Sequence, residues 1–314
     1  MSLFRKPSEL EVTATIKALI YGSPGIGKST AALSAPSPVL FDFDGGVQRV
    51  NGAFQVPTLQ VKNWEEVVQA LAELKANAVE CKTIVIDTAG KMLDYMGDYI
   101  MRNDSKMRMR DGSLSLKGYG ARKIMFINFL KEVSLMGKHI VFVAHEREDK
   151  DGELRIVRPE IGGSSANDLI KELDLVGYMQ AIGKDRTIFW SPQEKFYAKN
   201  ACNLPESVKI PVVLDSSGNV IADNTFLTTV FEAYHKYLGE IRKKRSSYDN
   251  LLSSFIKGIE SVEDADAAND VYTKIENYGK HVWDSKAQAE KRLEIKCHTL
   301  GLKFNAINNM YETA

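Results

Sequence analysis

Short runs of apolar residues alternate with stretches of helical periodicity along the first half of the chain. Four of these runs have the length of buried strands and occupy Thr13–Tyr21, Val39–Phe43, Thr83–Asp87 and Ile140–Ala144. Helices are predicted from Ser29 and over Trp64–Ala76 and Lys123–Met136. Because buried strands that alternate with helices are typical of a parallel sheet covered on both faces, the sequence predicts an α/β fold.

The pattern changes near residue 149. Shorter strands separated by polar turns are predicted at Leu154–Val157, Leu175–Ile182, Thr187–Trp190 and Phe196–Ala198. We interpret them as antiparallel additions to the edge of the sheet. After the basic run Ile241–Ser247, the tail predicts two or three helices. We therefore expect one domain over residues 1–245 and a small helical C-terminal region over residues 246–314.

Composition limits the function classes without selecting one. The 314 residues carry 41 basic and 41 acidic side chains, so any nucleic-acid site must be a local patch. The three cysteines lie far apart, which excludes a disulfide framework and favours a reducing compartment. The first ten residues lack an apolar signal-peptide core, and no apolar stretch has the length of a membrane span. We expect a cytoplasmic protein with no membrane partner.

One glycine-rich motif predicts phosphate binding directly. It follows the first strand, precedes the first helix, and consists of Gly22, Ser23, Pro24, Gly25, Ile26, Gly27, Lys28 and Ser29, with Thr30 next. Glycines let backbone N–H groups converge on phosphate oxygens, the lysine reaches the terminal phosphates, and the serine hydroxyl holds Mg²⁺. The helix that starts there adds its positive end. These residues predict a P-loop that binds ATP with Mg²⁺.

Acidic residues end two neighbouring strands. Asp87 ends the third strand, where a carboxylate can organise Mg²⁺, although it could instead bond the following turn. Thr88 follows it, so either the acid that activates water lies elsewhere or the chain hydrolyses ATP poorly. Asp44 is our candidate for this base, and Asp42, on the same side of the second strand, would support it or bind Mg²⁺ through water. The alternative is that both aspartates only cap a turn.

A polar residue also follows the fourth strand. His145 stands where a side chain can contact the γ-phosphate and report its loss to the next loop. A structural histidine is the alternative.

The ordered set of these motifs resembles a known family. The segments YGSPGIGKST, LFDFDGG, TIVIDT, KGYGARK, VFVAHERED and FYAKN, spread over residues 14–211, resemble phage-type RecA-fold P-loop ATPases. These are AAA-domain nucleotide-binding proteins that include single-strand annealing recombinases. The resemblance implies a RecA-like core, ATP as the nucleotide, and location in the bacterial host cytoplasm if the chain is phage-encoded. It also implies that Lys28 and Ser29 bind phosphate and Mg²⁺, Asp87 is the magnesium acid, Asp44 the catalytic acid and His145 the sensor.

The resemblance adds Lys199, in FYAKN, as a further candidate catalytic residue. In RecA-type filaments such a lysine reaches the phosphates of the neighbouring subunit, which would make the active unit a homo-oligomer. An ordinary surface lysine is the alternative. This chain departs from the family pattern at two positions, with Asp44 in place of glutamate and Asn200 in place of the arginine that usually follows the lysine.

A basic segment between residues 102 and 123 is the candidate DNA site. Its predicted contacts are Arg102, Lys106, Arg108, Arg110, Lys117, Tyr119 and Arg122. Cations neutralise backbone phosphates and an aromatic ring can stack on an unpaired base, so we expect a flexible loop that contacts single-stranded DNA. A solvated charged loop is the alternative. The stretch 147–163 would be a second loop, but its acids outnumber its bases.

Together these features predict an ATPase, stimulated by DNA, that acts on single-stranded DNA in annealing or recombination. A P-loop motor or loader of a replication or packaging machine, acting through protein partners, is the second interpretation. A phosphotransferase on a small metabolite is the third, and a nucleotide-binding scaffold without turnover is the last.

Overall fold

The computed structural model describes residues 15–151, 154–162, 165–183 and 185–313. The chain divides into two compact units, of which the first ends at His235 and the second begins at Lys236. This division lies inside helix α6 (Phe226–Glu260), which also contains residue 245, where we predict the domain boundary. The basic run near that boundary is therefore helical, and not a linker.

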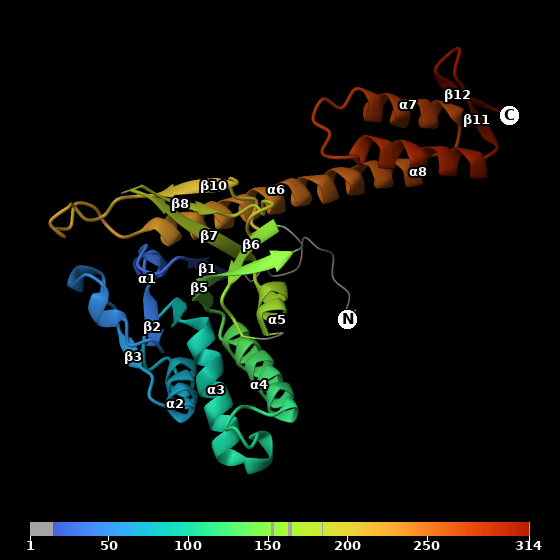
Figure 1. Cartoon of the computed structure of the whole chain (residues 1–314). Helices are drawn as coiled ribbons and strands as arrows, with labels where there is room; N and C mark the ends of the chain where they lie inside the picture. The colour runs from blue at the N-terminus through green and yellow to red at the C-terminus, as the bar shows by residue number, and fades with distance from the viewer. Residues whose placement is uncertain (1–14, 152–153, 163–164, 184, 314) are drawn as a thin grey trace. The chain divides into compact units, whose positions relative to one another are not determined.

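A sheet of ten strands, counted over the described residues, forms the centre of the first unit (Figure 1). The strands are β1 (Lys17–Gly22), β2 (Pro38–Asp42), β3 (Thr58–Gln60), β4 (Thr83–Asp87), β5 (His139–Asp151), β6 (Leu154–Pro159), β7 (Leu175–Ile182), β8 (Asp185–Phe189), β9 (Lys199–Asn200) and β10 (Ser207–Ile210). Their order is β10-β8-β7-β1-β5-β4-β2-β3, with β6 paired to β5 and β9 paired to β7.

The predicted α/β fold with a mainly parallel sheet is confirmed. Strands β7, β1, β5, β4, β2 and β3 run parallel to one another, while β6, β8, β9 and β10 add antiparallel pairs. In this order one strand, β5, separates the strand of the phosphate loop from the strand that ends at Asp87. One expectation was wrong, because β7 joins β1 in parallel and is not an antiparallel addition.

Helices and short 3₁₀ turns connect the strands of the first unit. The helices are α1 (Lys28–Ala32), α2 (Trp64–Lys75), α3 (Ala89–Asn103), α4 (Leu116–Leu135) and α5 (Ser165–Glu172), and the 3₁₀ turns are η2 (Val47–Arg49), η3 (Gly52–Phe54) and η4 (Ser105–Met107). Helix α2 begins where predicted because the Asn63 side chain accepts a hydrogen bond from Glu66 N at 3.0 Å. Helix α4 begins earlier than predicted because Ser115 caps it in the same way, through Gly118 N at 3.2 Å.

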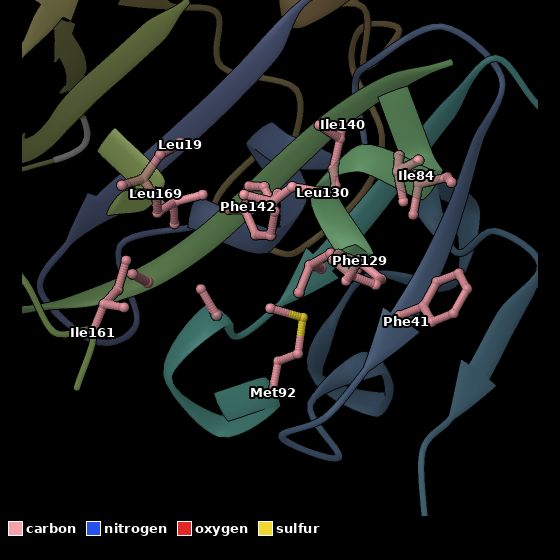
Figure 2. Close-up of a cluster of buried hydrophobic side chains, with 14 of the residues drawn as sticks. Leu19, Phe41, Ile84, Met92, Phe129, Leu130, Ile140, Phe142, Ile161 and Leu169 are labelled. Atoms are coloured by element: carbon pink, nitrogen blue, oxygen red, sulfur yellow. The ribbon is translucent and has the colours of Figure 1, made fainter. Parts of the chain in front are cut away.

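Apolar side chains are buried on both faces of the sheet, as the continuous apolar runs predict. In β4, Ile84 and Ile86 pack against helices α2, α3 and α4, while Val85 faces α1 and the first turns of α6. Figure 2 shows the cluster that contains Ile84, in which Phe129 and Leu130 of α4 pack against the sheet. Because packed apolar side chains cover both faces of the sheet, the loops at the carboxyl ends of its strands are attached to a rigid base.

The second unit contains the rest of α6, α7 (Ala265–Glu276), α8 (Ser285–Thr299) and a hairpin of β11 (Leu302–Asn305) and β12 (Met310–Thr313). Its small core includes Phe255, Ile275, Leu293 and Tyr311. The helices agree with the prediction, whereas the hairpin was not predicted. None of the described helices combines the length and the apolar composition that a membrane span requires.

Candidate nucleotide site

The phosphate loop lies at the carboxyl end of β1, between that strand and α1. Gly25 and Gly27 adopt φ values of 78° and 94°, which side chains with a Cβ rarely tolerate. Gly22 is required for a second reason, since a Cβ there would lie 2.3 Å from the Met179 carbonyl oxygen. The glycines thus give the loop the backbone shape that turns N–H groups toward a phosphate. Thr30 follows within α1.

The lysine of this loop is buried and held in place. Lys28 is 4% exposed, and its Nζ donates a hydrogen bond to the Ser23 carbonyl oxygen at 2.8 Å. Burial lowers the pKa of Lys28, and the carboxylates of Asp87, Glu146 and Asp44 oppose that shift, in decreasing order. The ammonium group is therefore buried near three acidic side chains, where an anionic ligand would further stabilise its charge.

Ser29 and Asp87 come from distant parts of the chain and meet directly. The Ser29 hydroxyl donates to Asp87 Oδ2 at 2.6 Å. Burial raises the pKa of Asp87, the Ser29 hydrogen bond lowers it, and the neighbouring Asp42 and Asp44 carboxylates raise it further. A buried carboxylate next to a hydroxyl is a set of hard oxygen donors that a cation would stabilise. These two residues fit Mg²⁺.

The two aspartates after β2 have different environments. Asp42 is buried, and its carboxylate accepts hydrogen bonds from the backbone N–H groups of Gly46 and Val47, each at 3.0 Å. Asp44 is exposed and forms an ion pair with Arg49 at 3.2 Å. The expectation that both lie on one side of the strand was wrong, because β2 ends at Asp42 and the chain turns there. Asp42 closes this turn, and Asp44 is left as the candidate base.

His145 lies inside β5, the strand next to β1, and β1 leads into the phosphate loop. It is the register partner of Gly22, the first glycine of the motif, so the predicted sensor borders the phosphate loop. Its Nδ1 is buried and has no hydrogen-bond partner among the described residues. A ring nitrogen in this position is able to bond a ligand oxygen.

Two residues that we did not predict also contact the loop. Ser23 donates its hydroxyl hydrogen bond to Oε1 of Glu146, on β5, and Arg186 Nε, on β8, donates to the Ile26 carbonyl oxygen at 2.6 Å. Gly27 leaves space for this arginine, since a Cβ there would lie 3.3 Å from Arg186 Nε. No local spacing in the sequence connects these pairs, and only the position of Glu146 beside His145 could have indicated it.

Lys199 has intramolecular partners in this chain. Its Nζ donates to the carbonyl oxygens of Ile170 and Lys171, at 3.1 Å and 3.2 Å, in the last turn of α5. The following Asn200 closes a turn with Leu204 through two hydrogen bonds. The arrangement gives Lys199 a helix-capping role within one chain. Its predicted contact with a neighbouring subunit stays a prediction.

The basic segment 102–123 is structured over most of its length, so the expectation of a single flexible loop was wrong. It contains the end of α3, the turn η4 and the start of α4. Arg102 pairs with Glu65 at 3.0 Å, while Arg122 is buried, 8% exposed, with its guanidinium carbon 4.9 Å from the centre of the Tyr119 ring. Arg122 is thus packed into the protein, and it is not presented to a ligand as predicted.

Four cations of this segment remain exposed. They are Lys106, Arg108, Arg110 and Lys117, and none of them forms an ion pair with the residues that the structure describes. Tyr119 is 48% exposed beside them. In the stretch 147–163, by contrast, the arginines pair with acids of the β5–β6 ribbon: Arg147 and Arg158 lie 3.1 Å and 3.6 Å from Asp149, and Arg155 lies 3.6 Å from Glu148.

Comparison with solved structures finds a KaiC-like protein of the hyperthermophilic archaeon Pyrococcus horikoshii, with 12% sequence identity and a TM-score of 0.32, over 56% of this chain and 77% of that one. No curated protein matches the chain. A family model described as an AAA domain matches residues 14–202, which include the phosphate loop, Asp87 and His145. The chain therefore belongs to this AAA domain family and carries a P-loop ATPase domain.

Proposed function

We propose that this protein binds ATP with Mg²⁺, hydrolyses it, and uses the cycle to act on single-stranded DNA as a phage-type annealing or recombination protein. The observation that carries the first part is the meeting of Lys28, Ser29 and Asp87 at one strand edge, with Ser29 and Asp87 2.6 Å apart. Such a group, next to a loop of the required backbone shape, is suited to hold a triphosphate and its metal ion.

Each residue has a distinct task in this proposal. The loop N–H groups and Lys28 bind the β- and γ-phosphates and stabilise the negative charge of the transition state. Ser29 and Asp87 would hold Mg²⁺, which would neutralise phosphate charge. Asp44 accepts the proton of the attacking water, and His145 contacts the γ-phosphate from β5. Lys199 would complete the site of a neighbouring copy in a homo-oligomer.

The DNA part of the proposal depends on the four exposed cations of the basic segment. Lys106, Arg108, Arg110 and Lys117 have no acidic partner among the described residues, so their charge is available to phosphates. Tyr119 offers a partly exposed ring next to them for stacking on a base. Single-stranded DNA presents both groups at once, which makes it the best-suited ligand.

The test is the rate of ATP hydrolysis with and without single-stranded DNA, measured together with DNA binding over a series of salt concentrations. We expect turnover without DNA, stimulation by DNA, and binding that weakens steeply as salt rises. Turnover that ignores DNA, together with no salt-dependent binding, would contradict the DNA part and favour a motor or loader that acts through proteins.

The nucleotide part has its own control. Hydrolysis should require a divalent cation and produce free phosphate. Transfer of the γ-phosphate to an added metabolite, in place of release to water, would identify a phosphotransferase instead. Binding of ATP with no release of phosphate under any condition would leave a scaffold.

A further inference from the structure

Glu146 lies against the phosphate loop, and only one of its two carboxylate oxygens forms a hydrogen bond. Its Oε1 accepts the hydrogen bond of Ser23 Oγ, the second residue of the loop. Its Oε2 is buried and has no hydrogen-bond partner among the described residues. The Tyr178 hydroxyl interacts with this carboxylate but completes no hydrogen bond to Oε2, so that oxygen can still accept a hydrogen bond from a donor outside the chain.

The position of this oxygen relative to the phosphates follows from Lys28. Lys28 Nζ bonds the carbonyl oxygen of Ser23, and Ser23 is also the residue that holds Glu146. Burial dominates the lowered pKa of Lys28, and among the acids that oppose it Glu146 acts more strongly than Asp44. Ser23 therefore links Glu146 to the lysine that, in such a loop, reaches the terminal phosphates.

A carboxylate and a phosphate oxygen cannot bond each other directly, because neither carries a proton at neutral pH. A water molecule between them can donate one hydrogen bond to Oε2 and present its oxygen to the γ-phosphorus. The donor that Oε2 lacks and the nucleophile that the reaction needs are therefore the same molecule.

We propose that Glu146 is a further catalytic residue, whose Oε2 accepts a hydrogen bond from the attacking water while Oε1 stays fixed on Ser23. The inference rests on the proposed ATP hydrolysis and names a residue for it. In the step, the water oxygen forms a bond to the γ-phosphorus and the bond from phosphorus to the β–γ bridging oxygen breaks. ADP leaves with that electron pair, and the water's other proton passes to Asp44.

A purely structural role would be a clamp between the phosphate loop and the β5–β6 ribbon, whose first residue pair is Glu146 and Pro159. A clamp uses the Ser23 bond alone, whereas the catalytic role also requires Oε2 as an acceptor for water. The two roles also predict different effects on ATP binding, because removing a negative charge near the phosphates strengthens binding or leaves it unchanged, whereas loss of a clamp on the loop weakens it.

The experiment compares Glu146→Gln with Glu148→Gln in the full-length chain. The glutamine keeps the acceptor for Ser23 and replaces Oε2 by an NH₂ group, which cannot accept a bond from water. Glu148 lies two residues along the same strand, is 65% exposed at its side chain, and pairs only at 3.6 Å with Arg155, so its change controls for a lost surface charge. The readouts are kcat, the Kd for ATP, and the melting temperature.

For Glu146→Gln we expect kcat to fall about 10- to 100-fold, with ATP bound as tightly as in the wild type or more tightly. Glu148→Gln should match the wild type in both. Ser23→Ala, which removes the anchor but keeps the carbonyl that Lys28 bonds, should lower kcat by a smaller factor. Wild-type kcat in Glu146→Gln would overturn the inference, and so would a parallel loss of kcat, ATP affinity and melting temperature. If the wild type itself releases no phosphate, the proposed hydrolysis fails, which is a different result.

Discussion

The phosphate loop and the basic segment 102–123 look alike in composition and differ in structure. Both combine glycines with cations, and both precede or enter a helix. In the loop, Lys28 is buried and bonded to a carbonyl oxygen. In the segment, Arg108 and Arg110 are exposed and have no acidic partner among the described residues. The loop selects its ligand by shape and fixed contacts, whereas the segment can select only by charge and stacking.

The strongest way to test this difference is to remove one lysine from each region. Lys28→Ala should lower ATP turnover about a thousandfold or more, because the charge on the transferring phosphate loses its nearest cation. Lys117→Ala removes the same charge from an exposed position and should leave turnover without DNA unchanged. Steady-state phosphate release measures both. Equal losses in the two variants would show that the loop acts only through general positive charge.

The regions of the molecule also differ in how much of their structure could be predicted from the sequence. The strand Thr83–Asp87 and the loop before α1 were predicted correctly because a contiguous pattern determines each of them. Helix α3 was missed, since Gly90 and Gly97 interrupt its sequence; space is limited at Gly90, where a Cβ would lie 3.0 Å from the Glu160 carbonyl oxygen. The extension of β5 was missed as well, because residues 146–151 are polar and become a strand only by pairing with β6.

The candidate site shows the same division between local and distant information. Ser29 and Asp87 could be predicted to meet because each ends or follows a recognisable strand. Glu146 and Arg186 could not, because they touch Ser23 and Ile26 across 123 and 160 positions of the chain. Only the register of β5 and β7 beside β1, and of β8 beside β7, brings these residues together, and no spacing rule in the sequence encodes that register.

A second prediction concerns Asp44, which follows β2. Asp44→Asn should lower kcat about 100-fold and leave ATP binding intact, because the amide keeps the shape but cannot accept a proton. Asp42→Asn is the informative partner, since Asp42 accepts two backbone hydrogen bonds and closes a turn. We expect it to lower the melting temperature and to affect kcat less. Turnover that survives in Asp44→Asn would show that Asp44 is not the base.

The third prediction concerns DNA and leaves the ATP site untouched. The double change Arg108→Ala and Arg110→Ala should weaken binding of single-stranded DNA and reduce the slope of log affinity against log salt by about 1.4, that is, about 0.7 for each lost phosphate contact. Turnover without DNA should be unchanged. Lys75→Ala with Lys209→Ala removes two exposed lysines elsewhere and serves as the control. An equal change in slope for both pairs would mean that the basic segment is only a solvated surface.

The smallest effect on function is expected at Arg122. This residue belongs to the basic segment in sequence, but its side chain is buried like that of Lys28 in the phosphate loop. Its side chain is 8% exposed, stacks on Tyr119, and lies 4.0 Å from the position of a Cβ at Gly97. Arg122→Met keeps the aliphatic packing and removes the charge, so the free energy of unfolding should fall by about 1–3 kcal/mol while the salt slope of DNA binding stays the same. Denaturant unfolding and the salt series measure the two quantities separately. A reduced slope with unchanged stability would show that Arg122 contacts DNA despite its burial.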